Sequence, residues 1–137
     1  MLYPEIHGQE NAKTILTRCF VLQKLAPVWL FTGPTGVQKN ALARAFIKTL
    51  LCPTPKFPDS SETQYCGNCS SCRLWATEAH PDFFHLKHSG KLRQIKREHT
   101  NDLLRFVSLK SYQGMVKAIL IQDADRLHVS SANALLK

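Results

Sequence analysis

The apolar residues of the chain recur in two patterns, and the order of these patterns predicts its elements. Apolar spacings of three and four residues, typical of one helix face, occur in residues 9–25, 39–51, 70–79, 98–107 and 128–137. Short apolar runs, typical of strands, lie at residues 28–32, 83–86 and 117–122. Glycine and proline punctuate the intervals, with turns expected at residues 89–90 and 113–114. Strands that alternate with helices, without internal repeats, predict an α/β fold with a mostly parallel sheet.

Residues 52–69 fit neither pattern, and cysteines lie at their edges. Four of the five cysteines are Cys52, Cys66, Cys69 and Cys72. A two-residue spacer lets a tight turn aim two thiolates at one point, and zinc takes four thiolates tetrahedrally. A redox dithiol would leave two neighbouring cysteines unexplained, and a fortuitous thiol cluster is the remaining alternative. The spacing therefore favours a structural zinc site with no open coordination position.

The fifth cysteine, Cys19, falls on the apolar face of the first expected helix and is interpreted as a buried core thiol. An odd number of cysteines in a chain without a secretory signal argues against a disulfide framework.

The segment 33–40, Gly-Pro-Thr-Gly-Val-Gln-Lys-Asn, follows an expected strand and precedes an expected helix, as a phosphate-binding loop does. Gly33, Gly36 and Lys39 match such a loop. Gln38 stands where the pattern of such a loop has its second glycine. Asn40 replaces the hydroxyl residue that holds magnesium in such loops. We expect weak nucleotide binding and no hydrolysis, with Lys39 a general cation at a helix start or simply solvated.

The expected strand at residues 117–122 ends in an acidic pair that resembles a Walker B motif. Asp123 fits the aspartate that supports the metal, but Ala124 occupies the position of the glutamate that orients the attacking water. Asp125 comes one residue too late for that role. The alternative is that Asp123 and Asp125 cap the turn into the last helix.

Composition narrows the class of protein. The chain has 137 residues, 44% of them apolar and 20% charged, which excludes a wholly disordered chain. It has no long apolar run and no basic start followed by an apolar stretch, so we expect a cytoplasmic protein without a membrane span. The net charge of +8, concentrated in residues 87–105, favours a polyanionic partner, either DNA or an acidic protein. The final helix lacks a cap, so we expect a longer protein.

Together these features resemble the clamp-loader branch of the AAA+ ATPases. The matching segments are residues 7–10, the glycine loop, the cysteine insertion, residues 80–82, the acidic strand end and residues 132–137. The resemblance covers essentially the whole chain, and the cysteine insertion after the glycine-loop helix is its most specific part. It implies a P-loop NTPase-like three-layer AAA+ base domain over residues 1–137, truncated before the lid domain, with a zinc-binding insertion at residues 52–72.

Within that branch, gamma/tau-type subunits keep an intact ATP site, whereas delta-prime-type subunits often carry a degraded one. Gln38, Asn40 and Ala124 make the chain similar to the delta-prime type of bacterial DNA polymerase III. The resemblance implies a non-hydrolysing subunit that helps to load the sliding clamp on primed DNA, with Zn²⁺ but not ATP as cofactor. The implied partners are the gamma/tau and delta subunits and, within the complex, primer–template DNA.

The resemblance places no catalytic residue in this chain. The arginine that such a subunit supplies to a neighbour's ATP would lie beyond Lys137. The degenerate nucleotide site would comprise Gly33, Gly36, Lys39 and Asp123. Two other functions stay open: an ATP-binding gamma/tau-type subunit, and a stand-alone zinc-stabilised DNA-binding module.

Overall fold

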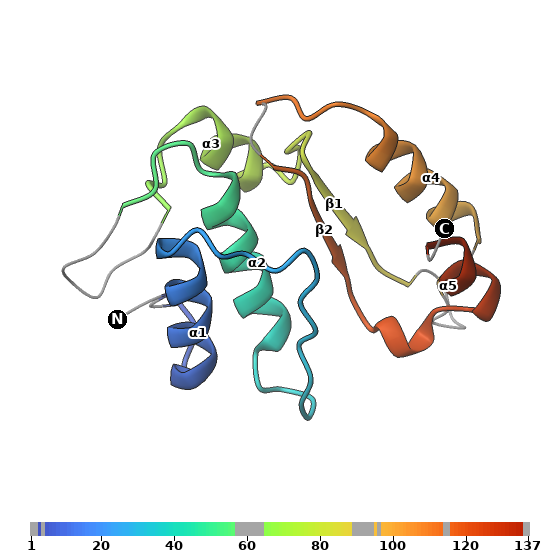
Figure 1. The fold of residues 1–137 in the computed structure, drawn as a ribbon, viewed down its shortest axis with the longest axis horizontal. Coiled ribbons are helices and arrows are strands. Elements are labelled where there is room, and N and C mark those ends of the chain that lie inside the picture. Colours follow the sequence, from blue (N-terminus) through green and yellow to red (C-terminus); the bar gives the residue numbers. More distant parts are fainter. Residues whose placement is uncertain are drawn as a thin grey trace. The chain divides into compact units, whose positions relative to one another are not determined.

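The chain folds into two compact units, Met1–His80 and Pro81–Lys137, whose helices and strands are labelled in Figure 1. Each unit has its own apolar core. The structure is a computed structural model that describes residues 3, 5–56, 65–88, 95, 97–113 and 116–135. The turns expected at residues 89–90 and 113–114 lie wholly or partly outside the described residues, and so do residues 57–64 of the irregular stretch after Cys52. Within the described residues, no helix has the length and apolar character needed to cross a membrane.

The first unit contains α1 (Glu10–Val21), α2 (Lys39–Leu51) and α3 (Ser70–Ala76). The helix expected at residues 39–51 is confirmed at both ends. Helix α1 is shorter than predicted, because Gln23 adopts a left-handed φ of 53° and the helix ends at Val21. Cys19 is half-buried rather than fully buried. The core joins the segment before α1 to both long helices; its buried members are Tyr3, Ile6, Leu16, Leu42, Ala45 and Phe46.

The prediction of a buried strand at residues 28–32 was wrong for the described structure. The segment is not in a strand, and the only strand pairing among the described strands joins two others. Trp29 and Phe31 pack against the core, with the Trp29 ring 5.8 Å from that of Phe46, whereas Val28 and Leu30 are each 81% exposed. The apolar run thus buries alternate side chains, but without a neighbouring strand its backbone cannot form a ladder.

The second unit is built on a parallel βαβ arrangement. Strands β1 (Phe83–Leu86) and β2 (Ala118–Ile121) pair in parallel, with Phe83 opposite Ala118 and Leu86 opposite Ile121. Parallel strands need a long crossover, and α4 (Arg97–Ser108) supplies it. Beyond β2 come the 3₁₀ turn η1 (Ala124–Arg126) and α5 (Val129–Leu135), as Figure 1 shows. These elements confirm the predicted alternation of strands and helices and a small parallel sheet.

The core of the second unit lies between the sheet and its helices. Helix α4 packs against both β1 and α5. Leu86, Ile95 and Leu103 are its buried centre. Burial of three such side chains contributes roughly 1.5–3 kcal/mol each. The α4–β2 connection is fixed by Lys117, whose ammonium donates to the carbonyl oxygens of Phe106 and Leu109 at the end of α4. A cation at these carbonyls complements the helix dipole.

Candidate metal centre and glycine loop

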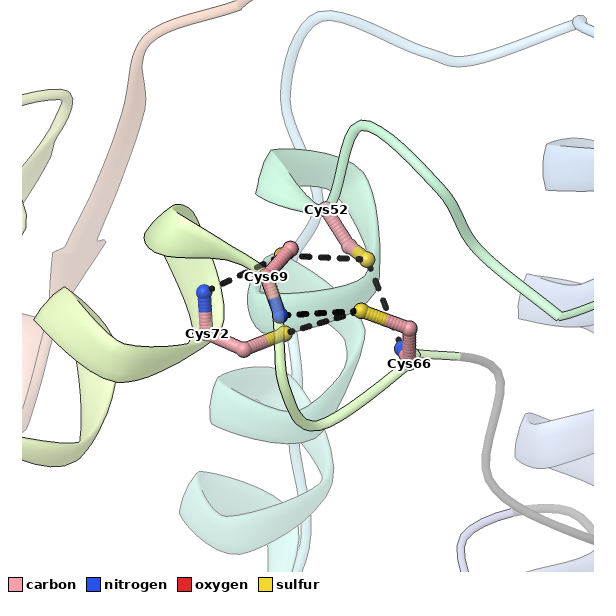
Figure 2. Close-up of side chains that lie close together, drawn as sticks. All are labelled: Cys52, Cys66, Cys69 and Cys72. Carbon is pink, nitrogen blue, oxygen red and sulfur yellow. Dashed lines mark hydrogen bonds between the residues drawn. The ribbon is translucent and has the colours of Figure 1, made fainter.

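The four predicted cysteines converge in the first unit. Cys52 caps the C-terminus of α2, Cys69 is the N-cap of α3, and Cys72 lies in the first turn of α3. Cys66 lies in the loop that leads into α3. Figure 2 shows the four side chains directed at one another, and all four sulfur atoms lie within 4.8 Å of each other. The cysteine spacing therefore predicted a real cluster, and none of the four is in a disulfide.

The distances in this cluster fit a tetrahedral metal. Cys52 Sγ lies 3.9 Å from Cys69 Sγ, and Cys66 Sγ lies 4.0 Å from Cys72 Sγ. Four thiolates at roughly 2.3 Å from zinc would have sulfur atoms about 3.8 Å apart. A disulfide would require a separation of about 2 Å. The four ligands would all be soft thiolate sulfurs, and together they would fill a tetrahedral coordination shell. The arrangement therefore suits a structural rather than a catalytic metal ion.

Backbone amides support the sulfur atoms as they would support thiolates. The N–H groups of Cys66, Cys69 and Cys72 donate to the sulfurs of Cys52, Cys66 and Cys69, each at 3.4 Å. The Thr54 hydroxyl and backbone N–H groups lower the pKa of Cys66 to about 5. Burial instead raises the pKa of Cys72 to about 12, and burial also raises that of Cys52. The apolar setting of the last two thiols thus disfavours unpaired thiolates, which a bound cation would neutralise.

A buried serine joins the two helices that carry the cysteines. The Ser71 hydroxyl donates to the Leu51 carbonyl oxygen at 2.6 Å, beside Cys52. Because its single proton is used there, its oxygen accepts from His80 Nε2, at 2.7 Å. Ser71 and His80 are both buried. Sequence reasoning noted the His80 motif only as a family feature; the helical position of Ser71 beside Cys72 was the available signal for this support.

Two cation–π contacts also attach the cysteine segment to α2. Arg44 lies over the Trp75 ring of α3, 5.4 Å from its centroid, and Lys48 lies 3.6 Å from the centroid of Tyr65. Arg44 also pairs with Glu78 at 3.1 Å. Because Arg44 and Lys48 are four residues apart, they share one face of α2. That face therefore contacts the chain on both sides of the stretch from Cys66 to Cys72.

The glycine loop keeps a tight course in the first unit. Gly33 and Gly36 have φ values of 146° and 91°, and Gln38 is the N-cap of α2 with a left-handed φ of 58°. Gln38 Oε1 accepts from the His7 N–H at 3.0 Å. Lys39 Nζ donates to the Pro34 carbonyl oxygen at 3.1 Å, within the loop itself. Lys39 thus contacts its own loop in this structure, and nucleotide binding by Gly33, Gly36 and Lys39 stays a prediction.

Asp123 belongs to the second unit, where it follows β2. Its backbone is left-handed, with a φ of 53°, and it is the N-cap of η1 without a side-chain capping bond. Asp123 Oδ2 instead lies 3.5 Å from His88 Nε2. Asp125 is exposed within η1. Ala124 directly follows Asp123. The position where a glutamate would orient water therefore holds no carboxylate in this described part of the chain.

The charge cluster predicted at residues 87–105 is only partly described. Lys91, Arg93 and Lys96 lie outside the described residues. Two exposed basic residues of this cluster are described. Lys87 directly follows β1, and Arg105 lies in the last turn of α4. A role of this cluster in DNA contact stays a prediction.

The fold and the site define a mixed helix–strand protein with a small parallel sheet and a four-cysteine cluster suited to a metal. Residues 8–137 match the family described as "DNA polymerase III, delta subunit". The chain is 36% identical over 112 residues to DNA polymerase III subunit delta' of Pseudomonas aeruginosa, covering 82% of this chain and 33% of the relative. It is 31% identical over 135 residues to DNA polymerase III subunit tau of Escherichia coli, covering 98% of this chain and 20% of the relative.

A third relative, DNA polymerase III subunit tau/gamma of Haemophilus influenzae, is 33% identical over 140 residues, covering 98% of this chain and 18% of the relative. The chain therefore belongs to the family described as DNA polymerase III, delta subunit. It spans between about a fifth and a third of the length of these relatives. It is similar to the amino-terminal portion of a delta-prime subunit.

Proposed function

We propose that the protein is a delta-prime-type subunit of a bacterial DNA polymerase III clamp loader, which helps to load the sliding clamp on primed DNA. The observation that carries this proposal is the left-handed Gln38 at the entrance to α2, where a nucleotide-binding loop needs glycine. Asn40 and Ala124 point the same way. The identity to a relative named delta' supports it.

Both units would belong to one AAA+ base domain over residues 1–137, with residues 52–72 as its metal-binding insertion. The order of helices and strands and the small parallel sheet support this assignment. Such a subunit would act as a fixed partner in a ring with gamma/tau and delta subunits. Since it does not cycle ATP, it could offer a cation from an unchanging position to a neighbour's nucleotide, where charge develops on the γ-phosphate.

The metal that we propose for the four cysteines is zinc. The soft, closed set of four sulfurs and the spacings of 3.9 and 4.0 Å support it. Zinc would hold the end of α2 and the start of α3 together across the long segment between Cys52 and Cys66. It would have no part in a reaction, because no coordination position is left for a substrate.

A gamma/tau-type subunit is the second candidate, because the identity to tau extends over 98% of the chain and Gly33, Gly36 and Lys39 are retained. Titration of the full-length protein with a fluorescent ATP analogue and Mg²⁺ separates the two. The delta-prime proposal expects no saturable binding in the micromolar range, with an intact gamma subunit as the positive control. Micromolar binding abolished by Lys39→Ala would establish the gamma/tau function instead.

A pull-down tests the ring assignment. Full-length protein should retain the gamma/tau and delta subunits together, and the reconstituted set should load a clamp on primed DNA. A stand-alone DNA-binding module would retain neither subunit, and would bind duplex DNA alone with a steep dependence on salt.

A further inference from the structure

Helices α1 and α2 begin in the same unusual way. Each follows a glutamine in the left-handed conformation, Gln9 with a φ of 62° and Gln38 with a φ of 58°. Left-handed backbone is unfavourable for a residue with a Cβ atom, and glycine would adopt it freely. Neither glutamine caps its own helix with its side chain. Both amide groups are therefore available for contacts beyond the helix that they precede.

The two side chains reach across to each other's loop. Gln38 Oε1 accepts from the backbone N–H of His7, two residues before Gln9, at 3.0 Å. Gln9 Nε2 donates to the carbonyl oxygen of Val37, the residue before Gln38, at 3.2 Å. One bond uses an amide oxygen and the other an amide nitrogen, so the two contacts are complementary. They join segments about thirty residues apart in the chain.

Both joined segments are fixed on their other sides. The buried ammonium of Lys13 donates to the Ile6 carbonyl oxygen at 2.6 Å, and Ile6 itself lies in the core. Lys39 Nζ ties the start of α2 to Pro34 at the opposite side of the glycine loop. The pair of glutamines thus connects two anchored segments, so each bond limits the movement that would break the other.

We propose that Gln9 and Gln38 form a reciprocal tether that closes the glycine loop on the segment before α1 and orders it without a nucleotide. In a nucleotide-binding loop, phosphate contacts supply this order, and the glycine at the corresponding position leaves room for them. Here the chain keeps the glycine-like backbone at residue 38 and uses the side chain for a protein contact. The tether is a property of these residues and does not depend on which clamp-loader subunit the chain forms.

Hydrogen exchange at the His7 amide in full-length protein tests the tether, because this N–H donates directly to Gln38. Gln38→Met removes the acceptor at similar length, and we expect His7 to exchange at least about threefold faster. Gln38→Glu keeps an acceptor oxygen and should keep the protection. Gln9→Met should also speed exchange at His7, because the two bonds reinforce each other. The Leu42 amide, which donates to the Gln38 backbone oxygen at 2.9 Å, is the internal control and should not change.

The proposal is overturned if Gln38→Met leaves His7 exchange unchanged while Leu42 remains protected, or if Gln38→Glu exchanges as fast as Gln38→Met. A urea unfolding curve for each variant verifies that the exchange is measured on folded protein. A variant that fails to fold is replaced by Gln38→Leu, which also lacks the acceptor.

Discussion

His88 Nε2 lies 3.5 Å from Asp123 Oδ2, so the carboxylate that follows β2 faces an imidazole from the segment that follows β1. The two residues meet because parallel strands bring their carboxyl ends to the same edge of a sheet. Both side chains are partly exposed, at 28% and 39%, so the pair contributes at most about 1 kcal/mol to stability. The contact matters more for what it says of Asp123, which the sequence predicts to support a metal and which has a protein partner here.

Replacing this aspartate should therefore have little effect on ATP turnover. In a reconstituted clamp loader, Asp123→Ala in this subunit should change the ATPase rate by less than about twofold, because Ala124 leaves no group to orient water. The same change in the matching aspartate of a gamma subunit is the positive control. A loss of about a hundredfold from Asp123→Ala would instead mean that this subunit performs hydrolysis.

Zinc removal should destabilise the first unit. Purified protein should contain about one zinc per chain, and zinc at a thousand times its dissociation constant would add about 4 kcal/mol to the free energy of unfolding. Replacing Cys66 and Cys69 together with serine should abolish the metal and this stabilisation. Cys19→Ser, outside the cluster, is the matched control and should keep the metal. Metal content is measured by plasma emission spectrometry, and an unchanged urea midpoint after chelation would contradict a structural role.

The convergence of the four cysteines could be predicted from the sequence because most of it depends on local spacing. The turn between Cys66 and Cys69 and the helix that carries Cys72 are short-range features, and both are read from adjacent residues. The bounds of α2 were predicted for the same reason. By contrast, nothing near Val28 in the chain shows whether another strand lies beside it, so an apolar run alone does not distinguish a paired strand from an unpaired extended segment.

The contacts that support the site were missed because they join distant residues. Ser71 contacts Leu51 across 20 residues of sequence, and Gln38 contacts His7 across 31. Polar side chains of these types occur on any surface, so their identity alone does not indicate a partner.

Ser71 should be more important for stability than its exposed neighbour. Ser71→Ala leaves the Leu51 carbonyl and His80 Nε2 without their buried partner, at a cost of about 2 kcal/mol. Because Leu51 precedes Cys52 and Ser71 precedes Cys72, we also expect faster loss of zinc to a chelator. Ser70→Ala is the matched control, since Ser70 is exposed. Urea unfolding and the rate of zinc release measure the two effects, and equal values for both variants would contradict this role of Ser71.

Asp82 should hold the connection between α4 and β2. Its carboxylate is 2% exposed and accepts from the N–H groups of Tyr112 at 2.6 Å and Gln113 at 3.1 Å. Asp82→Ala removes both charge-assisted bonds and should cost about 2–3 kcal/mol, whereas Asp82→Asn keeps one acceptor and should cost less. Hydrogen exchange at Tyr112 and Gln113 gives the local readout. Faster exchange at these amides in Asp82→Ala is expected; protection equal to that of the unaltered protein would refute the contact.

Tyr65 should make the protein less stable in alkali. Burial, with the nearby Glu5 carboxylate, raises the pKa of Tyr65 to about 12 from an ordinary value of 10. The folded state therefore favours the neutral phenol, and the stabilisation is complete below about pH 10 and is lost as the pH rises through 12. Tyr65→Phe keeps the ring beneath Lys48 but cannot ionise, so its urea midpoint should fall less between pH 9 and pH 12. Identical pH profiles for the two proteins would show that Tyr65 ionises equally easily in the folded and unfolded chains.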